Sequence, residues 1–274
     1  MNGSTEVEPP GFDPTQPSSA RIYDYWLGGK DNFAADREAA EKAVAYAPEI
    51  PRLAREGRRF LDRVVRFLAA AGVRQFIDIG TGLPTQGHVH EILRVAAPDA
   101  RVAYVDHDPV VLAHARALLE GTDRATVIQG DVRDPDGILR DPLLTELIDI
   151  GRPVAVLLMA VLHLIGDDDE AQPAVARLRE AMAPGSYLAI SHAVSDQEER
   201  SEAIAKLTKL YQEGPLKADK RRDLRSSKDV LAFFDGLELI HPGVVKVPAW
   251  RPEHDLRIED IESVWVVGGV ARKR

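Results

Sequence analysis

The sequence predicts an α/β protein whose central sheet is mostly parallel, with helices on both faces and an antiparallel final strand. After Gly72, short apolar runs alternate with stretches of helical periodicity, which is typical of parallel strands joined by crossover helices. The run "PVAVLLMAV" at 153–161 lacks polar alternation, as expected for a strand that is covered on both faces. The last two apolar runs have no helical stretch between them, which favours antiparallel pairing.

The chain before Gly72 differs from the rest and predicts a tail followed by helices. Residues 1–17 are rich in proline, glycine, serine and threonine, which bury little surface. Residues 18–72 contain three helical stretches separated by glycine and proline, and Asp31 or Asn32 is expected to cap the second of them. We therefore divide the chain into a flexible tail (1–17), an N-terminal helical cap (18–72) and a core (73–274).

Strands and helices are expected to alternate along the core. The expected strands are 75–79, 101–106, 125–129, 153–161 and 186–193, and the expected helices between them are 84–97, 109–120, 143–148 and 168–182. The C-terminal part is expected to hold a long helix at about 196–213, a basic loop at 215–227, a short helix with a capping box at Ser226 and Asp229, and strands at 237–247 and 263–272.

The composition limits the classes of function. The chain has 274 residues and no cysteine, which excludes disulfides and cysteine nucleophiles. Its formal net charge of −9 argues against a nucleic-acid partner. No apolar run reaches the roughly 18 residues that a membrane span needs. The N-terminus also lacks the basic and apolar regions of a secretory signal. We therefore expect a cytoplasmic protein that binds neither nucleic acid nor membrane.

A glycine turn follows the first core strand, in the stretch "QFIDIGTGLPTQGH" from Gln75 to His88. Glycines let the backbone turn tightly beside a ligand, but a tight turn alone is weak evidence for one. The tips of three successive strands, however, carry Asp78, Asp106 and Asp131. Ligands bind at the carboxyl ends of parallel strands, where an acid after the second strand suits ribose hydroxyls. An acid after the third could accept a hydrogen bond from adenine, so this edge predicts a nucleoside site.

The turn lacks the spacing of a dinucleotide site. Counted from Gly80, the third glycine of G-x-G-x-x-G would stand where the chain has Thr85. Asp78 would also face a pyrophosphate with like charge. A carboxylate suits a cationic ligand instead, and S-adenosylmethionine (SAM) carries a sulfonium and an ammonium but no phosphate. The sequence therefore favours SAM over NAD.

Several motifs resemble a known superfamily. "DIGTGLP", "YVDHDP", "QGDVRD" and the late hairpin resemble the class I SAM-dependent methyltransferases, which implies their Rossmann-like sheet. The N-terminal "SSARIYDYWLGGKDNFAADREAAEK" is similar to a bacterial family of uncharacterised SAM methyltransferases, and the resemblance covers nearly the whole chain after residue 18. Pro84 departs from the acid-x-Gly-x-Gly-x-Gly pattern, and it is tolerated if it begins the next helix.

The resemblance implies which residues hold the methionine part of the cofactor. Gly80, Thr81 and Gly82 would line it, with Asp78 near its amino group. Three residues of the helical cap are further candidates for contact with the cofactor: Arg21, Tyr25 and Asn32. Of these, Arg21 is expected to bind the cofactor carboxylate.

The resemblance also implies the residues around the nucleoside and the methyl group. Asp106 would hold the ribose, and His107 would lie against the adenine. Asp131 and the backbone of Val132 would bind the adenine edge. The segment from Ala160 to His163 would lie under the methyl group.

The sequence leaves the chemistry beyond the cofactor open. His163 is either a general base or a structural histidine, since an imidazole titrates near neutrality. The acidic run at 166–170 is interpreted as a helix start, and no metal site is expected. We predict a SAM-dependent methyltransferase that acts on a small-molecule acceptor and releases S-adenosylhomocysteine (SAH). The alternatives are a regulatory protein that binds SAM or SAH without catalysis and an NAD(P)-dependent oxidoreductase; neither the acceptor nor the oligomeric state is indicated.

Overall fold

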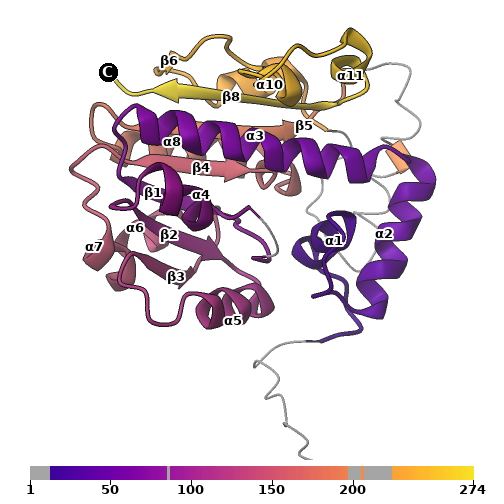
Figure 1. Ribbon diagram of the computed structural model, residues 1–274, viewed down its shortest axis with the longest axis horizontal. Helices are drawn as coiled ribbons and strands as arrows, with labels where there is room; N and C mark the ends of the chain where they lie inside the picture. Colours follow the sequence, from indigo (N-terminus) through magenta and orange to yellow (C-terminus); the bar gives the residue numbers. More distant parts are fainter. Residues whose placement is uncertain (1–12, 85–86, 197–204, 207–223) are drawn as a thin grey trace, which may run out of the picture.

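A computed structural model describes residues 13–84, 87–196, 205–206 and 224–274. Its described part contains an eight-stranded sheet in the order β3-β2-β1-β4-β5-β8-β6, with β7 also paired with β8 (Figure 1). The strands are β1 (Gln75–Ile79), β2 (Arg101–Asp106), β3 (Ala125–Gln129), β4 (Ala155–Met159), β5 (Tyr187–Ala193), β6 (Glu238–Leu239), β7 (Val245–Lys246) and β8 (Val266–Arg272).

The pairing confirms a mostly parallel sheet with an antiparallel end. Strands β3, β2, β1, β4 and β5 pair in parallel, whereas β8 runs antiparallel to β5, β6 and β7. The stretch 237–247, expected as one strand, is instead two short strands. The chain turns between them at Gly243, whose φ of 90° is left-handed and interrupts an extended run.

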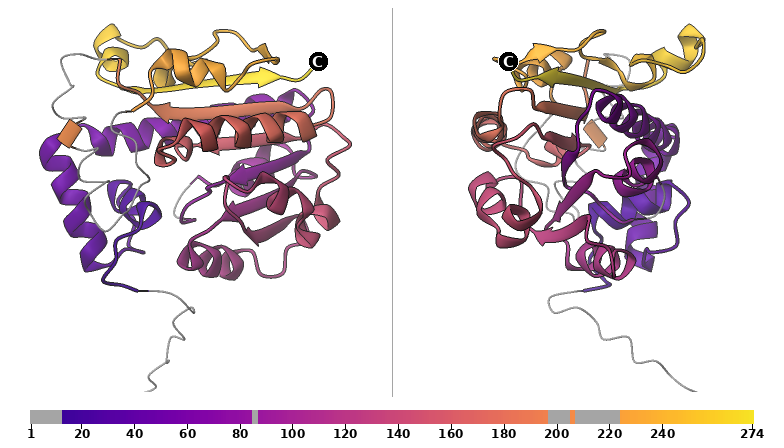
Figure 2. Two further views of the ribbon diagram at one scale, coloured as in Figure 1. Left: turned by 180° about the vertical axis from the view of Figure 1, so that it is seen from behind. Right: turned by 60° about the vertical axis from the view of Figure 1, so that its left-hand side comes forward.

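Helices cover both faces of the sheet, as the sequence predicted (Figure 2). On one face, α3 (Ile50–Ala70) and α4 (Val89–Ala96) pack against a side of β1 that includes Phe76. On the other face, Ile77 and Ile79 pack with α6 (Pro135–Arg140), α7 (Pro142–Leu147), α8 (Asp168–Ala181) and α10 (Ser227–Ala232). Successive side chains of a strand point to opposite faces, so each strand contributes to both apolar clusters.

Two helix starts differ from expectation. α4 begins at Val89 rather than at Pro84, because Gly87 has a left-handed φ of 66° that a helix cannot contain. α2 (Ala34–Tyr46) follows Phe33, whose backbone N–H donates to the Asp36 carboxylate at 2.8 Å, so neither Asp31 nor Asn32 is its cap. Pro84 therefore lies within the turn itself.

Other expectations concern the C-terminal part. The helix expected at 196–213 and the basic loop at 215–227 lie mostly outside the described residues. The capping box of α10 is confirmed, since the Ser226 hydroxyl accepts from the Asp229 backbone N–H. Four further elements are α5 (Pro109–Leu118), α11 (Ile258–Glu262) and the 3₁₀ turns η1 (Leu162–Leu164) and η3 (Val247–Ala249).

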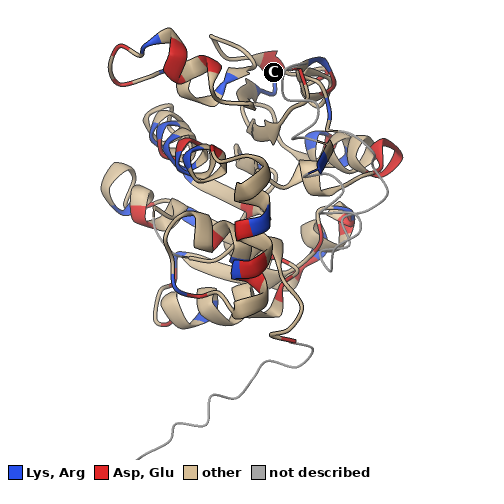
Figure 3. Cartoon of the chain, turned by 90° about the vertical axis from the view of Figure 1, so that its right-hand side faces the viewer, with Lys and Arg blue, Asp and Glu red and all other residues tan. Residues whose placement is uncertain are grey.

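The N-terminal helices cover the carboxyl ends of the parallel strands. α1 (Ser19–Trp26) and α2 stand beyond the carboxyl ends of β1, β2 and β4, while α3 runs back along the sheet (Figure 1). α3 and part of α2 belong to the same apolar cluster as the strands, whereas Ile22 of α1 packs with Ala39 and Ala40 of α2 in a separate cluster. Acidic and basic residues are interspersed on this side (Figure 3). The edge where the sequence placed a ligand is thus covered by helices.

Candidate functional site

The glycine turn after β1 comes close to the end of β4. Gly80 has a φ of 74°, and a Cβ built on it would lie 2.5 Å from the Cγ2 of Val161, so only glycine fits. The backbone N–H groups of Gly80 and Thr81 donate to the Val105 carbonyl at 2.8 and 3.3 Å. This ties the turn to the end of β2, and Gly80, Thr81 and Gly82 all line the cavity described below.

Asp78 is a buried carboxylate beneath this turn. Its side chain accepts a hydrogen bond from the Thr81 hydroxyl at 2.9 Å. Burial raises the pKa of Asp78 to about 6, although the Thr81 hydrogen bond and the Arg58 charge act in the opposite direction. A cation brought next to Asp78 would relieve this cost of ionisation, because opposite charge favours the ionised form.

Asp106, at the tip of β2, is also buried and lines the same cavity. One carboxylate oxygen accepts the Gly82 N–H at 2.9 Å, and the other accepts the Asp108 N–H at 3.0 Å. Burial raises the pKa of Asp106. Each carboxylate oxygen has a second lone pair, so two further donors can be accepted. His107 follows with a largely exposed ring and also lines the cavity.

The two residues expected at the adenine edge are engaged elsewhere. The Asp131 carboxylate forms an ion pair with Arg133 at 2.6 Å, which lowers the pKa of Asp131 against the opposing effect of burial. The Val132 side chain belongs to an apolar cluster of the core. Neither residue lines the cavity. Their contact with adenine stays a prediction.

The three candidates from the helical cap do not line the cavity either. Arg21 is buried and its Nε donates to Asp36 at 2.8 Å, so its charge is already compensated. The Tyr25 hydroxyl donates to Glu41, and the Asn32 side chain donates to Asp24 at 2.8 Å. The polar atoms of these candidates hold α1, α2 and their connecting loop together, and the role of Arg21 as carboxylate ligand is not supported.

Arg58 is the cavity residue that the sequence interpretation missed. It lies on α3, and its Nε is buried without a hydrogen-bond partner in the described part of the chain. Its guanidinium lies over the Tyr23 ring at 5.6 Å. A signal was present, because Arg58 interrupts an otherwise apolar stripe that includes Ala54 and Leu61. A half-buried guanidinium in a cavity, without a hydrogen-bond partner at its buried Nε, is suited to bind a carboxylate.

The end of β4 has an unusual backbone and brings a histidine to the cavity. Ala160 has a left-handed φ of 55°, which is uncommon outside glycine, and its N–H donates to the Ser191 side chain at 3.0 Å. After this turn, η1 places His163 in the cavity wall with its Nδ1 buried and without a partner among the described residues. Burial and the Arg225 charge lower the pKa of His163 to about 4. The ring is therefore neutral at pH 7.

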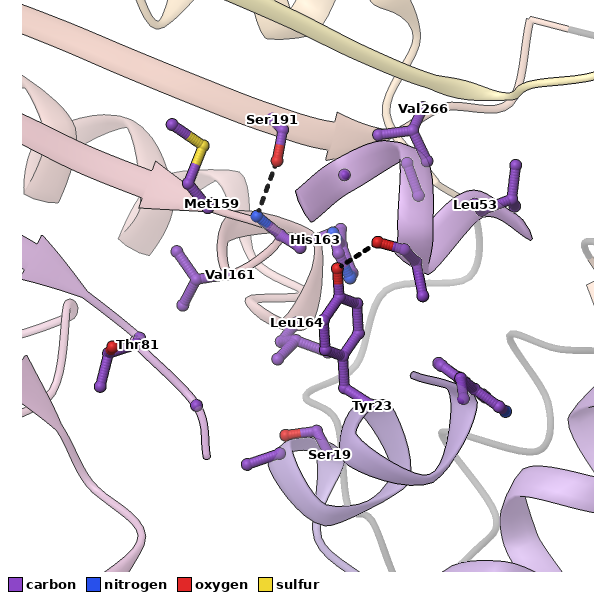
Figure 4. A pocket seen from close by; sticks show the side chains of 18 of the residues that line it. Ser19, Tyr23, Leu53, Thr81, Met159, Val161, His163, Leu164, Ser191 and Val266 are labelled. Carbon is purple, nitrogen blue, oxygen red and sulfur yellow. Dashed lines mark hydrogen bonds between the residues drawn. The ribbon is translucent and has the colours of Figure 1, made fainter. Parts of the chain in front are cut away.

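These residues surround one cavity of about 250 Å³ between the strand tips and the N-terminal helices. Figure 4 shows its interior, with Thr81 at the left, Ser191 and Val266 at the top, His163 near the centre and Tyr23 below His163. The sheet order explains this division. β2 and β1 carry the acids and glycines, whereas β4, β5 and β8 carry mostly apolar side chains.

The residues present fit SAM. Asp106 can accept two ribose hydroxyls, Asp78 offers a carboxylate for an ammonium, and Arg58 offers a guanidinium for a carboxylate. Asp78 and Arg58 both line the cavity, and the Arg58 charge acts on the Asp78 carboxylate. No group of three histidine, aspartate or glutamate side chains in the described residues could hold a metal ion.

Comparisons with known proteins agree with this geometry. The sequence profile of a family described as S-adenosyl methyltransferase matches residues 5–274. A protein of Thermobifida fusca YX, classed as a methyltransferase, is 39% identical with a TM-score of 0.89 over 98% of this chain and 100% of its own. A DUF574 family protein of Streptomyces avermitilis MA-4680 is also 39% identical, with a TM-score of 0.87 over 96% of this chain and 99% of its own.

More distant structures share the fold alone. An O-methyltransferase family protein of Burkholderia thailandensis is 15% identical, with a TM-score of 0.52 over 91% of this chain and 63% of its own. No curated protein sequence matches the chain. Within the described residues, every helix is too short or too polar to cross a lipid bilayer.

Proposed function

The chain belongs to the S-adenosyl methyltransferase family, and from this premise we propose that it transfers the methyl group of SAM to a small-molecule acceptor held in the same cavity. The observation that carries the proposal is the division of this cavity. One half offers the groups that SAM needs, and the other half continues past the methyl position toward β4, β5 and β8.

In this proposal the cofactor half binds SAM through three charged side chains. Asp106 accepts the ribose hydroxyls, Asp78 faces the ammonium, and Arg58 takes the carboxylate role first expected of Arg21. The ammonium and the carboxylate of the cofactor would each meet a side chain of opposite charge, Asp78 and Arg58, so that the charges compensate each other. A pyrophosphate would instead face two buried aspartates, which argues against NAD.

In this proposal the other cavity residues orient the cofactor and the acceptor and exclude water. Bound SAM supplies a methyl group that is already activated by its sulfonium, so catalysis needs mainly orientation and exclusion of water. Tyr23 and Trp26 from α1 and Leu53 from α3 cover the cavity. A cavity enclosed between helices and strand tips supports an acceptor of small-molecule size.

Thermal unfolding tests the choice of cofactor. We expect SAM and SAH to raise the melting temperature, whereas NAD should leave it unchanged. At a ligand concentration of 100 times Kd, the added stability is about 2.7 kcal/mol. A shift with NAD but not with SAM would reverse the proposal. Release of SAH on incubation with SAM and a cell extract would then distinguish an enzyme from a protein that only binds the cofactor.

Arg58→Ala tests the new carboxylate ligand. We expect at least about tenfold weaker SAM binding in calorimetry, because a hydrogen bond to a charged group contributes roughly 1.5–3 kcal/mol. Decarboxylated SAM, which lacks the group that Arg58 binds, should lose little affinity in the same variant. Arg55→Ala is the matched control, since Arg55 is an exposed arginine of the same helix. Equal losses for both ligands would remove Arg58 from the carboxylate site.

A further inference from the structure

The half of the cavity beyond the cofactor is lined by apolar side chains. Met159 and Leu164 come from β4 and the turn after it, and Ala193 ends β5. Val266 begins β8 and Trp265 directly precedes it, and the antiparallel direction of β8 brings its start to the carboxyl ends of the parallel strands. Together with the lining side chains of α1 and α3, these side chains form walls suited to a flat apolar molecule.

The aromatic walls of this half present carbon rather than polar atoms. The Tyr23 hydroxyl donates to the Ala54 carbonyl at 3.0 Å. The Trp265 Nε1 donates to the Glu49 carboxylate at 3.2 Å, and Tyr23 and Trp26 pack edge to face with centroids 6.5 Å apart. The Trp26 Nε1 donates to the Ala40 carbonyl at 3.4 Å, so the polar atoms of all three rings are occupied. Apart from the face of Tyr23 that Arg58 covers, the rings can offer an acceptor only their faces and edges, which favour another aromatic ring.

One polar atom in this half is buried and has no partner. Among the described residues, Nδ1 of His163 makes no hydrogen bond, although a buried polar atom without one costs roughly 1–3 kcal/mol. The His192 ring lies edge to face against the His163 ring at 5.5 Å, and His192 is itself held by the Arg225 guanidinium and the Ala193 carbonyl. The His163 ring thus lines the cavity against a neighbour that is held in place, and its Nδ1 has no partner among the described residues.

Charge is confined to the cofactor half. The charged side chains among the described lining residues are Arg58, Asp78, Asp106 and Asp108. Asp108 accepts from the Ser18 hydroxyl at 2.5 Å and caps α5, so it is engaged by the protein. Arg225, which is close to His163, is buried and bonded to Asp168 at 2.7 Å. Arg58, whose guanidinium lies over the Tyr23 ring, is engaged by the cofactor carboxylate in the proposed complex, so a charged acceptor would find no free counter-charge in this half and burying it would be costly.

We propose that the acceptor is an uncharged aromatic molecule with a ring hydroxyl, and that this hydroxyl donates its hydrogen bond to Nδ1 of His163. The inference rests on the proposed methyl transfer. Alkyl amines are excluded because they are cationic near neutral pH. An aromatic ring N–H could also donate, but the electron pair of its nitrogen belongs to the ring and is a poor nucleophile.

The transfer balances with this assignment. The hydroxyl oxygen forms the new bond to the methyl carbon while the carbon–sulfur bond breaks and leaves its electron pair on sulfur. The hydroxyl proton passes to Nδ1 of His163. The positive charge of the sulfonium thus becomes the positive charge of the imidazolium, so the net charge of the buried site does not change. A histidine of low pKa can still take the proton, because the hydroxyl becomes a much stronger acid as its oxygen bonds to the methyl carbon.

Binding to the SAH complex tests the inference separately from the cofactor. With the full chain saturated by SAH, affinities are measured for phenol, 2-naphthol and 2-hydroxyanthracene, each beside its methyl ether. We expect at least one hydroxy compound to bind at least about tenfold tighter than its ether, the effect of one lost hydrogen bond to a buried group. With SAM in place of SAH, mass spectrometry should detect the ether of that compound.

Two variants show whether His163 provides the preference. His163→Leu should abolish the preference for the hydroxy compound while SAH affinity stays within about twofold. His163→Asn places an acceptor oxygen near the position of Nδ1 and should restore most of the preference, which a purely structural histidine would not do. If SAH binds but no hydroxy compound is preferred, or if His163→Leu keeps the preference, the inference is wrong and the proposed function stands. Failure of SAH to bind would contradict the proposed function itself.

Discussion

Asp106→Ala is expected to weaken SAM binding at least about 100-fold, because the variant removes a charged acceptor for two ribose hydroxyls at roughly 1.5–3 kcal/mol each. The carboxylate lines the cavity at the tip of β2 and is buried, so water cannot fully replace it. Calorimetric titration with SAM and SAH gives the loss directly. Asp106→Asn should lie between the parent and the alanine variant, since it keeps one acceptor oxygen without the charge.

Stability is expected to fall as well in Asp106→Ala. The N–H groups of Gly82 and Asp108 each donate to this carboxylate and would lose their partner. Asp141→Ala is the matched control, because Asp141 also accepts a backbone N–H, from Leu143 at 2.8 Å, but lies outside the cavity. The control should lower the melting temperature without changing SAM affinity. If both variants lose affinity in proportion to stability, Asp106 has only a structural role.

The residues expected at the tips of β1 and β2 lie together in the cavity because they are encoded locally, and their contact with SAM stays a prediction. Asp78 stands one residue before the end of β1, and the chain runs directly into Gly80 and Gly82, so the acid and the turn share a strand tip. Asp106 follows in the same way from the end of β2. Such residues depend on their own strand and turn, and parallel pairing brings the strand tips together without further information.

Arg58 could not be assigned from sequence alone, because α3 carries six arginines and the packing of the helix decides where each points. Arg63 donates to the carbonyls of Val247 and Trp250, and Arg52 pairs with Asp260. Arg59 and Arg66 pair with acids of α3 itself. The apolar stripe around Arg58 was the available clue, yet it indicates burial rather than a ligand.

The roles expected of Arg21, Tyr25 and Asn32 depended on partners that the sequence does not reveal. Their polar atoms contact Asp36, Glu41 and Asp24 across the junction of α1 and α2. Those contacts join residues 8 to 16 positions apart and follow from how two short helices meet. The acceptor half was hidden for the same reason, since it combines residues of β4, β5, β8, α1 and α3.

Asp78→Asn is expected to weaken SAM binding and to stabilise the free protein at the same time. SAM affinity at pH 7.5 should fall at least about 100-fold, because breaking a buried ion pair leaves the other charge uncompensated at a cost of roughly 3–5 kcal/mol. The free protein should gain stability, because burial raises the pKa of Asp78 to about 6 and its ionised form is therefore unfavourable in the fold.

The pH dependence follows from the direction of this shift. Between about pH 4 and pH 6 the folded protein holds a proton on Asp78 that the unfolded chain has released, so the stability of the free protein falls as pH rises through this window. A rise of the pKa from 3.8 to about 6 corresponds to about 3 kcal/mol, all of it expressed above pH 6. SAM binding has the opposite dependence, because the ammonium requires the ionised carboxylate and affinity falls as pH drops below about 6.

Comparing the parent with Asp78→Asn separates the effect of Asp78 titration from that of nearby titratable groups. Burial also raises the pKa of Asp106, but this carboxylate is present in both proteins and so does not enter the comparison. The difference between their melting temperatures should therefore be large at pH 7.5 and vanish near pH 4, while the difference in SAM affinity should shrink as pH falls.

Thr81→Val serves as the control, since it removes the hydroxyl that donates to Asp78 but keeps the carboxylate. Without that hydrogen bond the pKa of Asp78 should rise further and shift the stability window to higher pH. If Asp78→Asn destabilises the free protein at pH 7.5 or binds SAM like the parent, then Asp78 is a structural carboxylate and the ammonium must be bound by other residues.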